Sequence, residues 1–309
     1  MPDTPKISNK ETAPLPENFR SGYVAVIGLP NVGKSTLLNQ LLHYKISIVS
    51  AKPQTTRKNV LGILNDKNYQ IVFIDTPGIL KPRYNLQEIM LRYVKSAIAD
   101  ADVLIYMIDV SDRRQTAAEI NKQLEIARGK AVILALNKID LLEKRQLLPL
   151  MAQFSEIHDF KTIVPISAEK SDGLEQLIAE AVQSLPFGHP YYPTDYISDQ
   201  QERFFVAEII REKIFQLYGE EIPYSTHVEI EAFKEREDRK DYIRAVILVD
   251  RPSQKGIIIG KKGQALKKVG ALAREEIEIF LDRPVFLELF VKVVEDWRRK
   301  DSQLKRLGY

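Results

Sequence analysis

The chain has 309 residues and a mass of 35.4 kDa, more than one compact core usually holds, so we expect two domains. Its 44% hydrophobic and 28% charged residues exclude a mainly disordered or collagen-like chain. The lack of Cys excludes disulfides, thiolate-bound zinc and a thiol nucleophile, and four His disfavour a His-based metal site. A net charge of +3 does not by itself indicate a nucleic-acid partner.

Apolar runs alternate with longer polar stretches in the first half of the chain. We expect strands at 21–28, 60–64, 69–75, 103–109, 131–137 and 162–167. The polar segment 65–68 predicts a β-hairpin between the second and third of these, and the later spacings leave room for helices. This order predicts a mostly parallel sheet with helices on both faces, which binds ligands at the carboxyl ends of its strands.

The pattern changes after residue 185. Three Pro and no apolar period in 185–200 predict an interdomain linker at 186–200. Beyond it we expect a helix at 201–219, strands at 225–233 and 241–250, a basic helical region at 254–280, a strand at 284–294 and a basic tail. The predicted organisation is a flexible leader at 1–20, an α/β domain at 21–185 and an α+β domain at 201–309.

A phosphate-loop pattern, G-x-x-x-x-G-K-[ST], lies between an expected strand and an expected helix. Its backbone N–H groups can face phosphate oxygens, while Lys34 supplies a cation and Ser35 a Mg²⁺ ligand. A Gly-rich turn that only caps a helix is the alternative. The predicted nucleotide contacts here are Gly28, Leu29, Pro30, Asn31, Val32, Gly33, Lys34, Ser35 and Thr36.

Two further motifs follow expected strands. In Asp75-Thr76-Pro77-Gly78, the carboxylate can hold Mg²⁺ through water and the Gly78 N–H can meet a γ-phosphate, although this tetrapeptide alone is usually a turn. In Asn137-Lys138-Ile139-Asp140, the last carboxylate can accept the N1–H and 2-amino hydrogens of guanine. Adenine lacks both donors, so the motif predicts GTP rather than ATP, with helix capping as the alternative.

The order of these motifs resembles that of the translation-factor-related GTPases. This resemblance implies that Thr56 is the switch-I ligand of Mg²⁺, with the adjacent Thr55 as an alternative. It also implies that Ser167-Ala168 contacts the base, with the Ala168 N–H directed at guanine O6. The implied catalytic residues are Lys34, Thr56, Asp75 and Gly78, and the implied Mg²⁺ ligands are Ser35, Thr56 and Asp75.

One position departs from the Ras-type pattern. Ile79, which is also among the predicted nucleotide contacts, follows D-x-x-G where those GTPases have a Gln, and it cannot orient water. The chain thus resembles the hydrophobic-substituted class, in which an Asn at the position of Asn31 helps to bind K⁺. We therefore predict slow basal hydrolysis that is faster in K⁺ than in Na⁺. A loop-stabilising role is the alternative for Asn31.

The second domain carries a basic I-I-G-x-x-G segment between expected helices, and 251–274 has seven Lys or Arg and no acid. Such a turn lets a nucleic-acid backbone approach, although a bare G-x-x-G predicts only a helix–turn–helix corner. The element order resembles the type II KH domain, which binds about four single-stranded nucleotides. The expected RNA-binding residues are Gly256, Ile258, Ile259, Gly260, Lys261, Lys262, Gly263, Lys267 and Lys268. Trp297 and the basic residues after it either extend this surface or form a solvated helix anchored by Trp297.

Residues 20–309 together resemble the Era-like GTPases, in which a P-loop GTPase domain precedes a type II KH domain. The resemblance implies Mg²⁺ with GTP or GDP, binding to the 3′ region of 16S rRNA and a role in small (30S) ribosomal subunit assembly. It also implies a cytoplasmic location with peripheral contact to the inner face of the membrane, and we expect a monomer. The rival functions are a GTPase of RNA modification and a membrane-surface switch whose basic domain binds anionic lipid or a protein partner.

Overall fold

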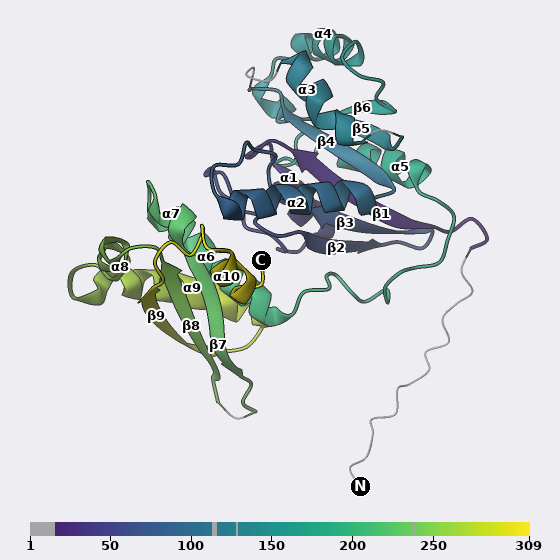
Figure 1. The fold of residues 1–309 in the computed structure, drawn as a ribbon. Helices are drawn as coiled ribbons and strands as arrows, with labels where there is room; N and C mark the ends of the chain where they lie inside the picture. The colour runs from purple at the N-terminus through teal and green to yellow at the C-terminus, as the bar shows by residue number, and fades with distance from the viewer. Residues whose placement is uncertain (1–15, 113–115, 128, 238) are drawn as a thin grey trace.

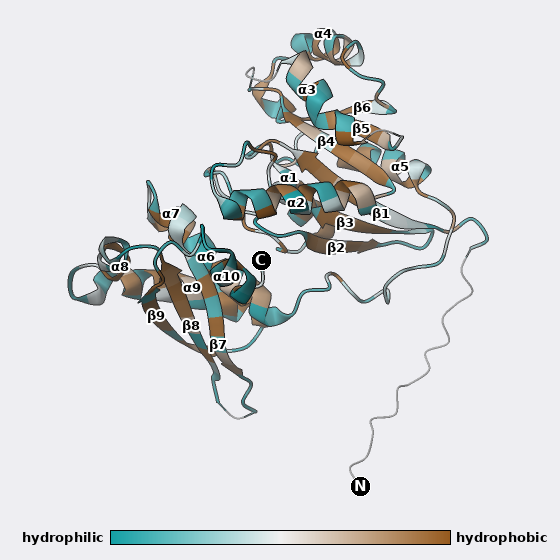
Figure 2. Ribbon diagram, viewed as in Figure 1, coloured by the Kyte–Doolittle hydropathy of each residue, from teal (hydrophilic) through white to brown (hydrophobic). Residues whose placement is uncertain are grey.

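The chain forms two units, each with its own sheet and hydrophobic core (Figure 1). The computed structural model describes residues 16–112, 116–127, 129–237 and 239–309, so most of the expected leader at 1–20 lies outside the described residues. The first unit holds a six-stranded sheet of order β2-β3-β1-β4-β5-β6, and the second holds a three-stranded sheet of order β7-β8-β9. Most of the strands in both units are coloured as hydrophobic, while the helices carry both hydrophobic and hydrophilic residues (Figure 2).

The first sheet is parallel except for its edge strand β2, which pairs antiparallel with β3 across the predicted hairpin. Its strands are β1 (Arg20–Gly28), β2 (Val60–Asn65), β3 (Tyr69–Asp75), β4 (Val103–Asp109), β5 (Ala131–Asn137) and β6 (Thr162–Ile166). Near-continuous apolar runs form β3, β4 and β5, as expected for strands that are buried on both faces. The predicted mostly parallel sheet is confirmed.

Helices cover both faces of this sheet. They are α1 (Lys34–Leu42), α2 (Asn85–Asp100), α3 (Ala117–Leu124), α4 (Lys144–Ser155) and α5 (Leu174–Ser184), with short 3₁₀ helices η1 (Glu125–Ala127) and η2 (Ile139–Leu141). The buried sides of α1 and α5 share one core with the sheet, while α2 and α3 share a second core on its other face. This arrangement leaves the carboxyl ends of β1, β3, β5 and β6 free to carry the site.

The second unit packs α6 and α9 against one face of its sheet. Its elements are α6 (Glu202–Leu217), α7 (Ile222–Ser225), β7 (His227–Lys234), β8 (Asp241–Val249), α8 (Pro252–Ile259), η3 (Lys261–Gly263), α9 (Gln264–Leu281), β9 (Val285–Val293) and α10 (Asp301–Arg306). Strand β8 runs antiparallel to β7 and parallel to β9. The predicted α+β order of helix, two strands, two helices and a strand is confirmed.

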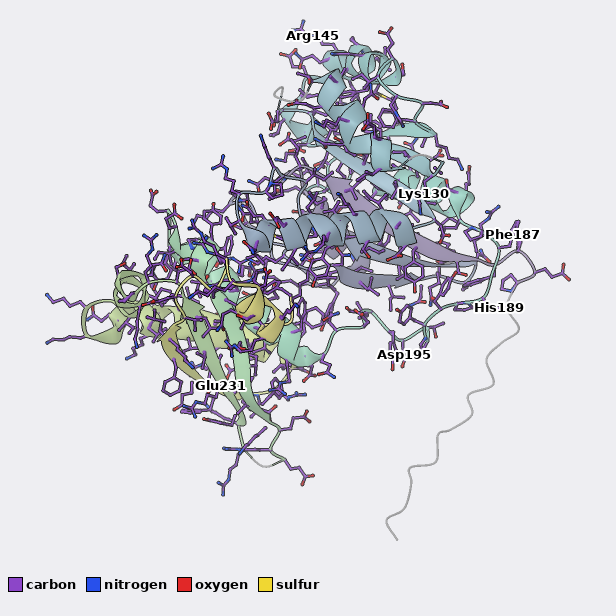
Figure 3. The ribbon with its side chains drawn as sticks, viewed as in Figure 1. Lys130, Arg145, Phe187, His189, Asp195 and Glu231 are labelled. Carbon is purple, nitrogen blue, oxygen red and sulfur yellow. The ribbon has the colours of Figure 1, made fainter. Side chains whose placement is uncertain are left out.

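The predicted linker at 186–200 runs alongside the edge strand β2 (Figure 1). The Ile63 N–H donates to the Ile197 carbonyl at 2.7 Å, and the Ser198 hydroxyl donates to the Leu61 carbonyl at 2.6 Å. Phe187, His189 and Asp195 lie along this segment (Figure 3). The linker thereby occupies hydrogen-bonding groups that an open sheet edge would expose. The exact domain boundaries stay a prediction.

None of the helices in the described parts of the chain combines the length and the apolar character needed to cross a membrane.

Candidate nucleotide site and nucleic-acid groove

Three glycines allow the phosphate loop to pack closely against its neighbours. Gly28 has φ +150° and Gly33 has φ +103°, and a Cβ at Gly33 would lie 2.3 Å from the Asn137 amide nitrogen. A Cβ at Gly78 would lie 2.7 Å from Pro30, so Gly78 also has no room for a side chain. The loop ends at the N-terminus of α1, where free N–H groups favour an anion. The predicted phosphate-binding segments therefore meet at one edge of the sheet.

Lys34 lies buried inside this loop with 7% of its surface exposed. Its ammonium donates to the carbonyls of Gly28 at 3.1 Å and Leu29 at 3.0 Å. Burial lowers the pKa of Lys34 to about 8, although the negative charge of Asp75 opposes the shift. An ammonium whose direct hydrogen-bond partners are carbonyls is a suitable partner for a phosphate group.

Three oxygen-bearing side chains converge beside Lys34. The Ser35 hydroxyl donates to Asp75 Oδ2 at 2.9 Å, and the Thr56 hydroxyl lies 3.2 Å from the same oxygen and 3.0 Å from the Ser35 hydroxyl. Burial raises the pKa of Asp75 despite these hydroxyls and Lys34, and its Oδ1 is buried without a hydrogen-bond partner among the described residues. The unsatisfied carboxylate and two hydroxyls are ligands that fit Mg²⁺. The Thr55 carbonyl instead accepts a hydrogen bond from Arg211.

The phosphate loop, the D-x-x-G turn and the segment 43–59, which we call switch I, enclose a cavity of about 430 Å³. This nucleotide cavity contains several residues that the sequence motifs did not indicate: Ile48, Val49, Ser50, Ala51, Gln54 and Glu169. Asn31 has φ +65°, and its side-chain amide donates to the Ala51 carbonyl at 2.7 Å. Asn31 therefore ties the phosphate loop to switch I, as its loop-stabilising alternative predicts.

The residues predicted to recognise guanine lie at the ends of β5 and β6. Asn137 is buried and donates to the Val32 carbonyl at 2.7 Å, while the Ser167 hydroxyl donates to Asp140 Oδ1 at 2.6 Å. The Ala168 N–H donates to Asn137 Oδ1 at 2.9 Å, and Ala168 is buried. This bond places the Ala168 N–H beside Asn137, and its contact with guanine O6 stays a prediction. Ser167 does place the Asp140 carboxylate.

Three other predicted nucleotide contacts are fixed by neighbouring groups. The Lys138 ammonium pairs with Asp109 Oδ2 at 2.5 Å. The Ile79 N–H donates to the Gly28 carbonyl at 3.0 Å, and its apolar side chain packs against the core on the α2 side of the sheet. The Thr76 hydroxyl donates to the Val26 carbonyl at 2.7 Å. These bonds hold the nucleotide-binding motifs in place at the edge of the sheet.

The G-x-x-G turn of the second domain lies beside a groove of about 480 Å³. Gly260 has φ +70°, and a Cβ there would lie 2.6 Å from the Ala265 Cβ. Gly263 has φ +76°, but a Cβ there would meet nothing within 4 Å. The side chains of Lys261 and Lys262 are exposed. The groove is lined by Gly263, Leu266, Lys267, Gly270, Ala271, Arg274, Leu287 and Leu289.

In the second domain one expectation is corrected, and one pair of alternatives is decided. Ile258 has 0% of its surface exposed and packs in the core of that domain, so direct contact with RNA is wrong for this residue. The groove instead uses apolar residues of α9 and β9, such as Leu266 and Leu287. Trp297 also has 0% exposure, and its indole N–H donates to the Ser225 carbonyl at 2.9 Å. It shares a core with Met90 and other residues of α2, so it does not extend the binding surface but anchors the C-terminal segment, as its alternative predicts.

Switch I is held between the nucleotide cavity and α6 of the second domain. The Glu212 carboxylate pairs with Lys45 and accepts a hydrogen bond from the Val49 N–H at 3.2 Å. The ammonium of Lys52 binds the Phe215 and Tyr218 carbonyls at the C-terminal end of α6, which satisfies groups that the helix leaves free. Switch I is thus bonded to both domains.

The chain is similar to known proteins in both of its domains. The 50S ribosome-binding GTPase family matches residues 23–138, and the KH domain family matches residues 221–298. A GTPase Era from Geotalea uraniireducens is 47% identical, with 95% of this chain and 99% of that protein aligned. A chloroplastic ERA-like GTPase from Arabidopsis thaliana is 42% identical over 94% of this chain and 69% of its own length.

Two solved structures have the same two-domain fold. A single-residue variant of Aquifex aeolicus Era bound to GDP·AlF₄⁻ is 43% identical, with a TM-score of 0.90 over 94% of this chain and 99% of that one. A complex of Era with MgGDPNP and nucleotides 1506–1542 of 16S ribosomal RNA gives the same identity, coverage and TM-score. Fold and site thus define a P-loop GTPase joined to a KH domain. More narrowly, the chain belongs to the Era GTPase family and is a GTP-hydrolysing enzyme.

Proposed function

We propose that this GTPase binds the single-stranded 3′ region of 16S rRNA through its KH domain and acts in assembly of the small (30S) ribosomal subunit. The observation that carries the proposal is the position of switch I, which borders the nucleotide cavity and is bonded to α6 of the KH domain. The relative whose complex contains 16S rRNA nucleotides supports the RNA partner. A cytoplasmic location and a monomer remain predictions from the resemblance and the sequence.

The proposed nucleotide chemistry uses the convergence at the strand ends. Lys34 pairs with phosphate oxygens, the Gly78 N–H meets the γ-phosphate, and Asp140 accepts hydrogens from guanine. Ser35, Thr56 and Asp75 would hold Mg²⁺, which when bound neutralises phosphate charge. Their hydroxyls and carboxylate already lie within 3.2 Å of one another. The relative bound to MgGDPNP supports this metal.

Potassium stimulation is a finer part of the proposal. Asn31 lies in the phosphate loop and contacts switch I through its side-chain nitrogen, so its amide oxygen is the group that would reach a monovalent cation. Such a cation could stabilise transition-state charge that Ile79 cannot address. Hydrolysis rates should be higher in KCl than in NaCl at equal ionic strength. Equal rates would contradict K⁺ assistance without affecting the GTPase assignment.

The proposed RNA site is the G-x-x-G turn and its groove. Lys261, Lys262, Lys267 and Lys268 would attract phosphates, while Leu266, Leu287 and Leu289 offer apolar contact to unstacked bases. Gly270 and Ala271 leave room on α9 for a strand to approach. Nucleotide state would act on this domain through switch I, and by reciprocity bound RNA would change nucleotide affinity.

The test compares Gly263→Asp with Gly263→Asn. Because a Cβ here meets nothing within 4 Å, and both Asp and Asn tolerate its left-handed backbone, the two variants differ mainly by one charge. Affinity is measured for a short RNA from the 16S 3′ end and a scrambled RNA, with the protein loaded with GDP or a non-hydrolysable GTP analogue. The aspartate should weaken binding at least about tenfold more than the asparagine.

Specific RNA binding that is stronger with the GTP analogue supports the proposed switch. Equal weak binding of both RNAs in both states would remove the RNA assignment and leave the GTPase. Vesicles with anionic lipid provide the second arm. If Gly263→Asp leaves RNA binding intact, the RNA site does not lie at this turn. If only vesicles are bound, the membrane-surface function replaces the proposed one.

A further inference from the structure

A second cavity lies on the other side of switch I, between the two domains. It has a volume of about 420 Å³ and is distinct from the nucleotide cavity and the KH groove, although Ile48 and Thr56 line both it and the nucleotide cavity. Switch I, α6, β7 and the residues from Arg306 onward form its walls. We call it the interdomain cavity. The proposed function assigns no role to this cavity.

Positive charge outweighs negative charge around the interdomain cavity. Its lining contains Arg57, Lys58, Arg203, Arg211 and Arg306, against two acids, Glu208 and Glu229. Glu208 is engaged by the Arg211 guanidinium at 2.8 Å, and Glu229 lies 3.5 Å from Arg306. Arg203 and Lys58 donate to backbone carbonyls instead, at 2.9 and 3.4 Å. Both acids are therefore paired while a cation excess remains.

Arg57 is the most deeply buried of the cations without a carboxylate partner in the described structure. It has 4% exposure, and its terminal nitrogens donate to the carbonyls of Pro223, Tyr224 and Thr226. Its Nε is buried without a hydrogen-bond partner among the described residues. The Nη1 of Arg211, a residue with 2% exposure, is in the same condition. A buried guanidinium with unused N–H groups is costly unless an anion compensates it.

The electrostatics of the cavity lining show a shortage of negative charge at Arg57 and Lys58. Burial lowers the pKa of both Arg57 and Lys58, although Tyr309 opposes the shift at Arg57 and Glu208 opposes it at Lys58. The pKa of Arg211 is instead raised, because its burial is outweighed by its pairing with Glu208. Burial, followed by the positive charges of Arg57, Lys58, Arg211 and Arg306, holds the pKa of His227 well below its usual range. His227 therefore adds no charge near neutral pH. Its ring lies 5.5 Å from that of Tyr309, and Phe204 supplies another aromatic wall.

We propose that the interdomain cavity binds a phosphorylated small molecule of nucleotide size. Its phosphate oxygens would accept hydrogen bonds from Lys58 and Arg306, the buried guanidinium of Arg57 would add positive charge, and the aromatic walls would cover a planar ring. The volume lies within the range of small-molecule sites. Both domains line the cavity, and its volume of about 420 Å³ is close to that of the nucleotide cavity, which fits a ligand of nucleotide size. Because Arg57 follows Thr56 directly in switch I, a ligand beside Arg57 would affect the position of switch I.

The test uses the full chain carrying Mg·GDP, separated from excess nucleotide so that the first site is filled. Inorganic pyrophosphate, ADP and adenosine are titrated by calorimetry. The single tryptophan is a second readout, because the Trp297 ring lies 5.8 Å from the Arg57 guanidinium. The test variant is Lys58→Gln with Arg306→Gln, and the matched control for charge removal is Lys122→Gln on α3, far from the cavity lining.

Pyrophosphate or ADP should bind while adenosine does not, and the double variant should weaken binding at least about tenfold. The control should bind as the unaltered chain does. Failure of both phosphates to bind, or equal affinity in the double variant, would overturn the proposal. A 12-nucleotide RNA that loses about tenfold affinity in the double variant while neither small phosphate binds would assign the cavity to a polynucleotide instead.

Discussion

The nucleotide cavity and the interdomain cavity lie on opposite sides of switch I but are built in different ways. The first uses short runs of neighbouring residues at strand ends, such as the phosphate loop that follows β1. The second uses single residues from switch I, α6, β7 and the C-terminal segment, with Arg57 binding a carbonyl 169 positions away. A site made of contiguous backbone leaves a motif in the sequence. A site made by domain packing leaves only scattered charges.

The largest expected effect is on the nucleotide cavity, when the phosphate-loop cation is removed. Lys34→Ala takes away the buried ammonium, which nothing else in the loop replaces, and should lower the GTP hydrolysis rate by about 10²–10³-fold. Steady-state kinetics measure this, with Lys122→Ala as the control for loss of a lysine. Near-normal hydrolysis would show that another group carries the charge stabilisation.

A second test of the nucleotide cavity compares the adjacent residues Thr55 and Thr56. The Thr56 hydroxyl lies by Ser35 and Asp75, so Thr56→Val should cut hydrolysis by about 10–100-fold and raise the Mg²⁺ concentration required. Thr55→Val preserves the carbonyl that Arg211 binds and should change the rate less than about twofold. Titration of Mg²⁺ against hydrolysis rate distinguishes them. A larger effect at Thr55 would reverse the assignment.

The ion pair between Glu212 of α6 and Lys45 of switch I tests how much the contact between the domains contributes to stability. Glu212 is nearly fully buried and pairs with Lys45, so Glu212→Gln should lower the free energy of unfolding by about 1–3 kcal/mol. Glu143 pairs with Arg145 at the exposed surface, and Glu143→Gln should cost less than about 0.5 kcal/mol. Denaturant unfolding measures both. Equal losses would mean that the α6 contact is only a surface pair.

The smallest expected effect is a pH dependence of GDP affinity. Without phosphate the pKa of Lys34 is about 8, and a bound phosphate raises it, so the bound protein holds more protons and binding weakens as pH rises through 8. Affinity should fall about fourfold between pH 7 and 8.5. Lys34→Gln should be flat over this interval. A parallel fall in that variant would assign the titration to another group.

The positions of the strands along the chain and the nucleotide motifs were predictable because each depends on local patterns. Apolar runs marked the six strands of the first sheet, and Gly28 and Gly33 marked a backbone that side chains would block. The direction in which each residue of a helix faces was not predictable from the sequence. Ile257, Ile258 and Ile259 are chemically alike, but successive residues rotate by about 100°, and only packing decided that Ile258 faces the core while Ile257 is exposed.

By itself the sequence determined a mostly parallel sheet, a phosphate loop and a KH-like element order, since hydrophobic period, glycine positions and motif spacing act over a few residues. Only the tertiary structure decided that Trp297 is buried against α2, that the linker covers β2, and that Arg57 is enclosed between the domains. Burial and charge compensation depend on partners distant along the chain, and such pairings have no local sequence pattern.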